Sequence, residues 1–242
     1  MQAIQTFSLG KRYRHLIAVD KLDLEIKQGE FFALLGVNGA GKTTTVKMLS
    51  CLTQPTEGDA VVGGYSVTKE PEKVKRLIGV SPQETAVAPN LSVKENLELI
   101  CGIHGFAKEK TRAKIRELSK TFALEHVLQR KAGKLSGGWQ RRVSIAMALI
   151  SEPKILFLDE PTLGLDVIAR HGLWETIRAL KGNVTILLTT HYMEEAEALS
   201  DRIGIMKDGR LLAVGTVEEL KRKAGASDFE TAFVTIVKEG TV

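Results

Sequence analysis

Residues 36–45, GVNGAGKTTT, combine glycines with a lysine and a run of threonines. The glycines allow the backbone to curl so that successive N–H groups point inward, toward an anion. In this pattern Lys42 reaches the β- and γ-phosphates of a nucleotide, and the Thr43 hydroxyl binds Mg²⁺. The stretch therefore predicts a phosphate-binding loop that opens a helix, whose N-terminus adds its positive end.

Two carboxylates, Asp159 and Glu160, follow the apolar run ILFL. Asp159, at the carboxyl end of a buried strand, is placed to bind the magnesium shell directly or through water. Glu160 is placed to orient or deprotonate a water in line with the γ-phosphate. A single acid at a strand end is most often a surface residue, but together with Lys42 the pair predicts hydrolysis of a nucleoside triphosphate.

The nucleotide is predicted to be ATP, with Mg²⁺ as its cofactor. A GTPase with this kind of loop usually contains the guanine-reading sequence N-K-x-D. None of the asparagines at 38, 90, 96 and 183 is followed by lysine. Adenine is therefore the expected base.

A second glycine-rich stretch, LSGGWQRR at 135–142, lies nearly a hundred residues beyond the first. Its two glycines follow a serine and leave backbone N–H groups free at the start of a predicted helix, which is how a protein builds an anion site. One small domain has no evident need for two such sites. The stretch therefore raises the question of which phosphate it contacts.

The elements that position these residues follow the pattern of an α/β protein. Short apolar runs such as 31–35 and 184–190 predict buried strands, and helical stretches alternate with them. This alternation implies a largely parallel sheet covered on both faces. The alternating residues 22–27 predict one half-exposed strand, and Asp208-Gly209 between apolar runs predicts a hairpin.

Residues 92–133 have a helical pattern that interrupts the α/β alternation. Ser92 and Glu95 form an S-x-x-E capping box, and helical periodicity continues to about Lys131. The predicted fold is α/β: a P-loop NTPase core with a mainly parallel sheet, an N-terminal antiparallel β part and an inserted helical subdomain. The predicted divisions are 1–91 and 134–225 for the two parts of the ATP-binding core, 92–133 for the helical subdomain and 226–242 for a C-terminal tail.

Composition excludes several classes of protein. The chain has 242 residues, of which 43% are hydrophobic and 26% charged, and these values argue against disorder and coiled coils. A net charge of +5 without a dense basic block does not favour nucleic-acid binding. No apolar run approaches the roughly 18 residues of a membrane span, and no signal-peptide pattern begins the chain. We therefore expect that the chain does not cross a bilayer by itself.

The order of the motifs resembles that of the nucleotide-binding domain of ATP-binding cassette (ABC) transporters, over nearly the whole chain. GVNGAGKTT is followed by SPQ with Gln83, then LSGGW, ILFLDEP, LGLD with Asp166, and TTH with His191. In that family two such domains pack head to tail. The serine-glycine segment of one domain (here Ser136, Gly137 and Gly138) covers the γ-phosphate held by the loop of the other. The resemblance thus gives the second stretch a function, which is to contact the partner's ATP.

The resemblance also assigns roles around the phosphates. Gln83 would bind magnesium at the joint between the core and the helical subdomain, and His191 would hydrogen-bond the γ-phosphate. The resulting catalytic residues are Lys42, Glu160 and His191, and the magnesium ligands are Thr43, Gln83 and Asp159.

Further roles concern the base and the dimer interface. Tyr13 lies where the family has an aromatic residue that stacks on adenine; an ordinary packed tyrosine is the alternative. Asp166 would cross the dimer interface. Trp139 departs from the family, which usually has glutamine at the end of LSGGW. The residues expected to contact the nucleotide are Tyr13, Asn38, Gly39, Ala40, Gly41, Lys42, Thr43 and Thr44.

The stretch TTHYMEEAEALSDRIGIMKDGRL most resembles ATPase subunits of bacterial exporters of drugs, lipids or polysaccharides. Such a subunit implies a second copy of itself or a homologous ATPase subunit, an integral membrane permease, and a location at the cytoplasmic face of the cell membrane. The alternatives are a soluble cassette protein of translation or DNA repair and a nucleotide-binding regulator without turnover. One cassette with a short insert argues against the first alternative, and Glu160 argues against the second.

Overall fold

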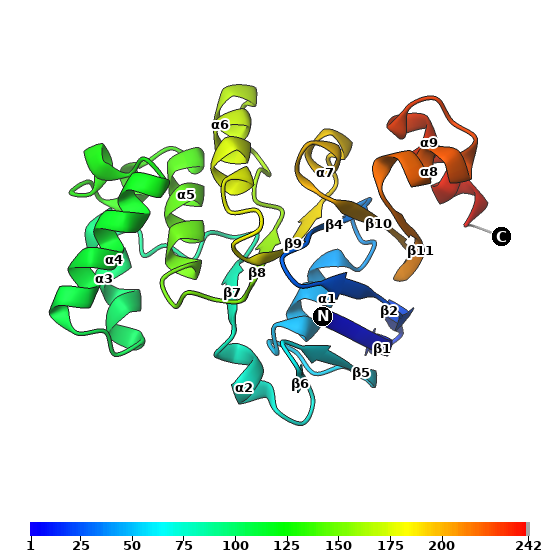
Figure 1. Ribbon diagram of the computed structural model, residues 1–242, viewed down its shortest axis with the longest axis horizontal. Helices are drawn as coiled ribbons and strands as arrows, with labels where there is room; N and C mark the ends of the chain where they lie inside the picture. Colours follow the sequence, from blue (N-terminus) through cyan, green and yellow to red (C-terminus); the bar gives the residue numbers. More distant parts are fainter. Residues whose placement is uncertain (241–242) are drawn as a thin grey trace.

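A computed structural model of the chain, which describes residues 1–240, contains two β-sheets (Figure 1). The larger sheet has the strand order β11-β10-β4-β9-β8-β7, and every neighbouring pair is parallel except the edge pair of β11 with β10. The predicted α/β fold with a mainly parallel sheet is therefore confirmed. The strands are β4 (Phe31–Gly36), β7 (Ile78–Ser81), β8 (Ile155–Asp159), β9 (Thr185–Thr190), β10 (Arg202–Lys207) and β11 (Arg210–Gly215).

The smaller sheet is antiparallel and confirms the predicted N-terminal β part. Its strands are β1 (Gln2–Tyr13), β2 (Leu16–Leu22), β3 (Glu25–Lys27), β5 (Glu57–Val62) and β6 (Tyr65–Ser66). The prediction of one strand over 22–27 was wrong, because β2 ends at Leu22 and β3 begins at Glu25. Between them, the Thr6 hydroxyl donates to Leu22 O (2.8 Å) and accepts from Leu24 N (2.7 Å). A side chain of β1 thus replaces the ladder where the chain passes from one strand to the next.

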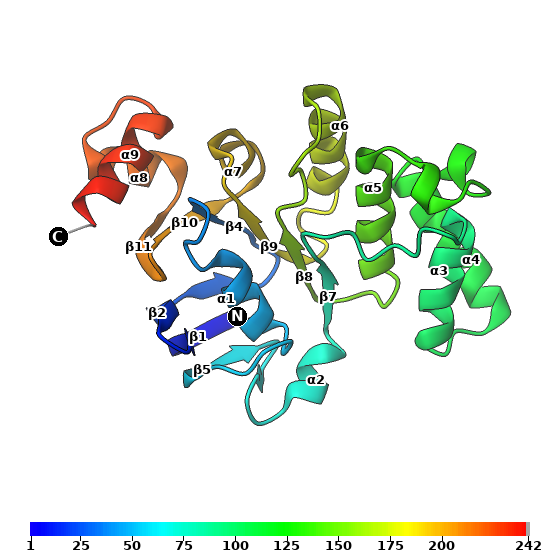
Figure 2. The same cartoon turned by 180° about the vertical axis from the view of Figure 1, so that it is seen from behind.

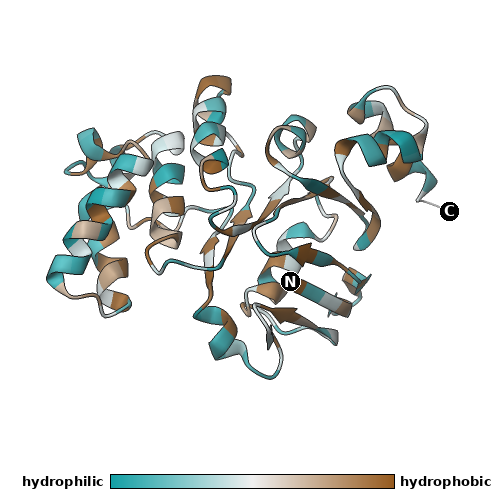
Figure 3. Cartoon of the chain, in the orientation of Figure 1, coloured by the Kyte–Doolittle hydropathy of each residue, from teal (hydrophilic) through white to brown (hydrophobic). Residues whose placement is uncertain are grey.

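Helices cover both faces of the large sheet. Alternate residues of β4 point to opposite faces, so each face has its own buried cluster. Phe31 and Leu35 belong to a buried cluster that includes side chains of α5, α6 and α7, whereas Phe32 and Leu34 belong to a cluster with α1 and the smaller sheet. Figure 3 shows these apolar strands in brown at the centre of the molecule. The core helices are α1 (Lys42–Leu49), α2 (Pro71–Lys75), α5 (Gly137–Ala148), α6 (Val167–Arg178) and α7 (Met193–Leu199).

The helical insert lies at one end of the molecule, beyond α5 (Figures 1 and 2). The predicted capping box is confirmed: Ser92 Oγ accepts from Glu95 N at 3.2 Å, and Ser92 N donates to Glu95 Oε2 at 2.7 Å. As divisions of the chain, the boundaries at 91, 133 and 225 stay predictions. The elements of this part are α3 (Val93–Ile103), α4 (Lys108–Thr121), η1 (Glu125–Val127) and η2 (Ala132–Lys134).

The C-terminal part lies at the opposite end, where α8 (Val217–Ala224) and α9 (Phe229–Glu239) pack together (Figure 1). Phe229 and Ile236 of α9 are buried in the core, so residues 229–239 of the predicted tail are part of the packed fold. Asp228 caps the helix by accepting from Thr231 N at 2.8 Å. None of the helices in residues 1–240 is both long and apolar enough to span a bilayer.

Candidate nucleotide-binding site

The predicted phosphate-binding loop connects β4 to α1, as its sequence context requires. Gly41 has φ of 100°, and a Cβ there would collide with the carbonyl of Ala18, so only glycine fits. Gly39 has φ of 82°. The loop therefore delivers the chain to the first turn of α1, where unpaired backbone N–H groups and the helix dipole favour an anion.

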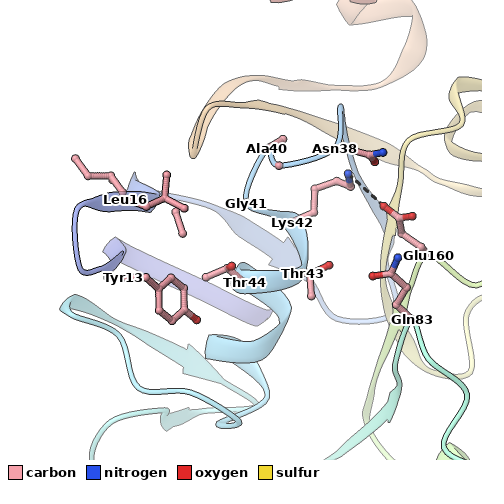
Figure 4. Close-up of a pocket in the computed structure, with 13 residues that line it drawn as sticks. Tyr13, Leu16, Asn38, Ala40, Gly41, Lys42, Thr43, Thr44, Gln83 and Glu160 are labelled. Carbon is pink, nitrogen blue, oxygen red and sulfur yellow. Dashed lines mark ion pairs between the residues drawn. The ribbon is translucent and has the colours of Figure 1, made fainter.

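Lys42 is held inside this loop by contacts on two sides. Its Nζ donates to Gly36 O at 2.8 Å and to Val37 O at 3.2 Å, and it lies 3.4 Å from Glu160 Oε1 (Figure 4). The side chain is buried. The ammonium is thus fixed between the loop and the carboxylate that follows β8.

Asp159 joins three elements at the carboxyl edge of the large sheet. Its Oδ1 accepts hydrogen bonds from the Thr43 hydroxyl of α1, at 3.1 Å, and from the Thr189 hydroxyl of β9. A carboxylate beside a hydroxyl suits Mg²⁺, which takes one or two protein carboxylates and completes its shell with phosphates and waters. Residues 1–240 contain no group of three or more His, Cys, Asp or Glu side chains that could hold a metal by themselves. A magnesium ion at Asp159 would therefore need phosphates and waters to complete its shell.

Glu160 has a left-handed backbone, with φ of 46°, that its neighbours enforce. Its N–H donates to both Thr189 O (3.0 Å) and Thr189 Oγ1 (3.1 Å). Strained backbone of this kind persists where surrounding contacts determine it, and is frequent at active sites. The conformation directs the carboxylate between Lys42 and His191, whose Nδ1 lies 3.1 Å from Glu160 Oε2. The two oxygens therefore have different partners.

A cavity of about 430 Å³ lies over the loop (Figure 4). Gln83, which follows β7, and Glu160, which follows β8, line it, and Tyr13 lines it from the smaller sheet. Tyr13 is 43% exposed, which does not fit the alternative of an ordinary packed tyrosine. The other lining residues are Leu16, Ile17, Ala18, Asn38, Gly39, Ala40, Gly41, Lys42, Thr43 and Thr44.

The serine-glycine segment is not part of this lining. Ser136 is the N-cap of α5, yet its side chain makes no capping hydrogen bond, and Gly137 and Gly138 form the first turn. The segment lies against the first turn of α6, since a Cβ on Gly138 would be 3.2 Å from Ala169 Cβ. Asp166 is exposed and caps α6 by accepting from Ala169 N at 2.8 Å. Ser136, Gly137, Gly138 and Asp166 thus lie outside the cavity lining. Asp159 and His191 also lie outside it, but they contact the lining residues Thr43 and Glu160.

Comparison with known families gives the same assignment. The family model described as "ABC transporter" matches residues 19–163, a range that contains the loop, Gln83, the serine-glycine segment and both carboxylates. This chain belongs to the ABC transporter family. The resemblance inferred from the motif order, and the cassette fold that it implies, are confirmed.

Curated relatives of this cassette have names that refer to resistance or export. The doxorubicin resistance ATP-binding protein DrrA of Mycobacterium tuberculosis is 43% identical over 91% of this chain and 66% of its own length. DrrA of Streptomyces peucetius is 42% identical over 93% of this chain and 69% of its own length. The Nod factor export ATP-binding protein I of Burkholderia thailandensis is 43% identical over 87% of this chain and 69% of its own length. The chain thus spans about two thirds of the length of these relatives.

Solved cassettes share the whole architecture. An ATP-binding subunit of an ABC transporter superposes with a TM-score of 0.85 at 30% identity, over 97% of this chain and 99% of that one. The cassette MJ0796, solved as a dimer in a post-hydrolysis state with ADP and Pi, gives a TM-score of 0.80 at 30% identity, over 88% of this chain and 98% of that one. The similarity therefore includes the helical insert as well as the core.

Thr189 is a site residue that the sequence did not reveal. Its hydroxyl contacts Asp159, and its backbone and side chain both accept from Glu160 N. The pairing of Asp159 with Thr189 in adjacent parallel strands produces these contacts. The only signal for Thr189 in the sequence was that two predicted core strands end in polar residues, LDE at 158–160 and TTH at 189–191.

Glu195 of α7 is a second residue that the motif analysis missed. It is completely buried, its Oε1 accepts from Trp174 Nε1 at 3.1 Å, and its Oε2 has no hydrogen-bond partner among the residues described. Burial raises the pKa of this carboxyl, and the Trp174 donor and nearby threonine hydroxyls offset only part of that effect. Glu195 thus links α7, which follows His191, to α6, which follows Asp166.

Proposed function

We propose that this cassette is the Mg²⁺-dependent ATPase subunit of an ABC exporter. The observation on which the proposal depends is that Glu160, next to Asp159, contacts both His191 and Lys42 and lines the cavity over the loop together with Lys42. A regulator that only binds nucleotide has no need of a carboxylate held in this position. The names of the relatives, which refer to drug resistance and Nod factor export, support an exporter rather than a soluble cassette protein.

The arrangement of side chains supports hydrolysis by attack of water on the γ-phosphate. Glu160 accepts a proton from the water as its oxygen bonds to phosphorus, and the bond from the γ-phosphorus to the bridging oxygen breaks to release ADP and phosphate. His191 and Lys42 stay against the γ-phosphate, where positive charge and hydrogen bonds stabilise the developing negative charge. Thr43, Gln83 and Asp159 would hold Mg²⁺, which when bound neutralises phosphate charge. Tyr13 would stack on adenine beside the loop residues 38–44.

The proposed ATPase is a dimer of two cassettes, because the serine-glycine segment lies outside the cavity of its own chain. Ser136, Gly137 and Gly138 do not line their own chain's pocket, so their free N–H groups are available to ATP on a partner cassette. Val167 and Ile168, directly after Asp166, are 61% and 86% exposed and offer apolar surface to an interface. The dimeric structure of the related cassette MJ0796 supports the same assembly.

Hydrolysis is tested by incubating the purified chain with ATP in Mg²⁺ and then in excess EDTA, with GTP as the comparison nucleotide. We expect phosphate release that needs Mg²⁺ and prefers ATP. Tight ATP binding without phosphate release under any of these conditions would instead support the regulator.

The permease and the membrane location form a separate part of the proposal. We expect a location at the cytoplasmic face of the membrane, through a permease subunit, and no nucleic-acid partner. Purification from detergent extracts of the native cell tests this directly. Copurification with one polytopic membrane protein is the expected result, whereas recovery with ribosomes or DNA would favour the soluble class.

A further inference from the structure

The helical insert contains a second cavity, of about 590 Å³. Its lining comes from α3, from α4 and from the segment around η1. Figures 1 and 2 show these elements together at one end of the molecule, and α8 and α9 lie at the other end. The cavity is therefore distinct from the candidate nucleotide site, whose lining belongs to the core.

One face of α4 contributes a row of cations to this cavity. The row consists of Lys108, Arg112, Arg116 and Lys120. Its members are four residues apart, so they share a face of the helix and extend over about 18 Å along its axis. All four are exposed, and among residues 1–240 none of them has an ion pair or a side-chain hydrogen bond. Lys114 of the same helix, by contrast, pairs with Glu117 and Glu152.

The charge of the lining is unbalanced. Lys94 and Glu98 also line the cavity, but they lie 3.5 Å apart and offset each other. The remaining carboxylate of the lining is Glu125, which stands against the four cations of the row. Such a surface attracts anions. Two of the four are arginines, whose planar fork fits the oxygens of a phosphate.

Ser119 supplies a polar group inside the cavity. It is 2% exposed and belongs to the lining, yet its Oγ has no hydrogen-bond partner among the residues described. A buried hydroxyl without a partner is costly, and a serine within a helix commonly bonds the carbonyl four residues before it. The Ser119 hydroxyl is thus free to donate to an oxygen in the cavity. Ile115 and Leu128 give the cavity apolar walls that continue into the core.

We propose that the row of cations and this cavity bind the phosphate groups of anionic membrane lipids. The proposal depends on the membrane location in the proposed function. A row of about 18 Å is longer than one phosphate and suits several phosphates side by side, as a lipid leaflet presents them. One headgroup enters the cavity, where its phosphate accepts from Ser119 and its carbon atoms contact Ile115 and Leu128. A nucleic acid also presents phosphates in a row, but its backbone has no apolar part for these two side chains.

Vesicle flotation tests the proposal with the purified full chain. We expect binding to vesicles of phosphatidylcholine mixed with phosphatidylglycerol, and no binding to phosphatidylcholine alone. Each lysine or arginine near an anionic membrane contributes about 5-fold to binding, so Arg112→Gln with Arg116→Gln should bind about 30-fold more weakly. Lys108→Gln with Lys120→Gln removes the same charge from the ends of the row and should show a similar loss. Both double variants should bind ATP as the wild type does, which establishes that they are folded.

The control removes the same charge from another part of the surface. Arg222 and Lys223 are exposed on α8, at the end of the molecule away from the insert. Arg222→Gln with Lys223→Gln should therefore keep most of the vesicle binding. An equal loss in this control and in the two row variants would overturn the proposal, because binding would then depend on net charge alone. Tighter binding of a DNA or RNA duplex than of the vesicles would overturn it in favour of a nucleic acid.

The cavity itself is tested with Ser119→Ala and a soluble short-chain phosphatidylglycerol, whose binding is followed by the melting temperature. The variant should bind this lipid at least about 10-fold more weakly, since a hydrogen bond to a charged group is lost. Without lipid it should be no less stable, because the hydroxyl has no partner to lose. Unchanged affinity in Ser119→Ala would exclude the cavity as the headgroup site.

Two further results separate this proposal from its alternatives. If glycerol phosphate raises the melting temperature as much as the lipid does, the ligand is a soluble phosphate ester and the lipid proposal is wrong. Failure of the proposed function is a different result, since it would appear as absence of phosphate release from ATP. Vesicle binding does not involve that reaction.

Discussion

Glu160 and His191 contact each other across two neighbouring parallel strands, with Glu160 Oε2 3.1 Å from His191 Nδ1. The register explains the contact: Asp159 at the end of β8 pairs with Thr189 near the end of β9, so the residues that follow lie side by side. Each side chain emerges at the carboxyl edge of the sheet, where open α/β sheets bind their ligands. The strand register therefore determines the distance between the proposed base and the histidine.

Glu160→Gln should bind ATP normally but hydrolyse it roughly 10² to 10⁴ times more slowly, since the change removes the base and keeps a side chain of the same shape. Phosphate release and the affinity for ATP are the two measurements. The control must be an acidic residue without a structural contact, which excludes Asp166 because it caps α6. Glu197→Gln, on an exposed part of α7, should leave turnover unchanged. Full activity of Glu160→Gln would remove Glu160 from the mechanism.

Lys42→Ala should weaken the binding of ATP itself. A charge-assisted hydrogen bond contributes about 1.5–3 kcal/mol, which corresponds to a dissociation constant about 10- to 150-fold higher. The matched control is Lys47→Ala, because Lys47 lies in the last turn of the same helix and is exposed. Titration with a fluorescent ATP analogue measures both variants. Equal affinities in the two variants would contradict the role given to Lys42.

Much of the site could be predicted because its chemistry is concentrated in short motifs. The loop of Lys42 and the pair Asp159-Glu160 each appear as contiguous residues, and the flanking apolar runs identify the strands that position them. Thr189 and Glu195 could not be predicted in this way. Their contacts depend on strand register and on the packing of α7 against α6, which sequence spacing does not encode.

The fold shows the same limit at two places. The alternation of residues 22–27 predicted one strand, but the Thr6 side chain takes the place of a backbone partner and divides it. Helix α9 was not predicted, although Asp228 is a good N-cap, because its eleven residues mix β-branched and polar side chains. Burial of Phe229 and Ile236 against the core stabilises a helix that local propensity leaves undecided.

Tyr13→Ala should weaken ATP binding by about 5- to 150-fold, because base–aromatic stacking contributes about 1–3 kcal/mol. Tyr13→Phe keeps the ring and should bind ATP as the wild type does. The ring is accessible, at 43% exposed, and Lys11 Nζ lies 5.1 Å from its centroid. If affinity is unchanged in Tyr13→Ala, the adenine lies elsewhere along the cavity.

Glu195→Gln should raise the free energy of unfolding at pH 8. The pKa of Glu195 is raised above 4.5 in the folded chain, so the folded state binds the proton more tightly and the carboxyl destabilises it as the pH rises through the folded pKa. Glutamine avoids this cost, and its oxygen still accepts from Trp174 Nε1. The gain should shrink as the pH falls through the folded pKa, below which the carboxyl is protonated in the folded state.

Urea unfolding at pH 8 and pH 5 measures this gain, with Glu197→Gln on the exposed part of the same helix as the control. The control should show no gain at either pH. Glu195→Gln should show a larger gain at pH 8 than at pH 5. A loss of stability of the same size at both pH values would mean that Glu195 is ionised and favourably paired in the folded chain.

The division of the site between two chains predicts complementation between two defective cassettes. One chain has Lys42→Ala, and the other has Gly138→Asp, whose carboxylate should repel the γ-phosphate that it approaches. Both also have Glu160→Gln, so that bound ATP is trapped. In the mixed dimer one site collects both defects, whereas the other combines an intact loop with an intact serine-glycine segment. Trapped ATP is therefore expected in the mixture and much less in either chain alone.

Two controls make the result decisive. A Cβ at Gly138 would lie 3.2 Å from Ala169 Cβ, so Gly138→Ala measures the steric part of the change without the charge. Different tags on the two chains establish that heterodimers form. If each site were built within a single chain, every chain in the mixture would be damaged and no combination would trap ATP. Confirmed heterodimers without trapped nucleotide would therefore exclude Ser136, Gly137 and Gly138 as ligands of the partner's ATP.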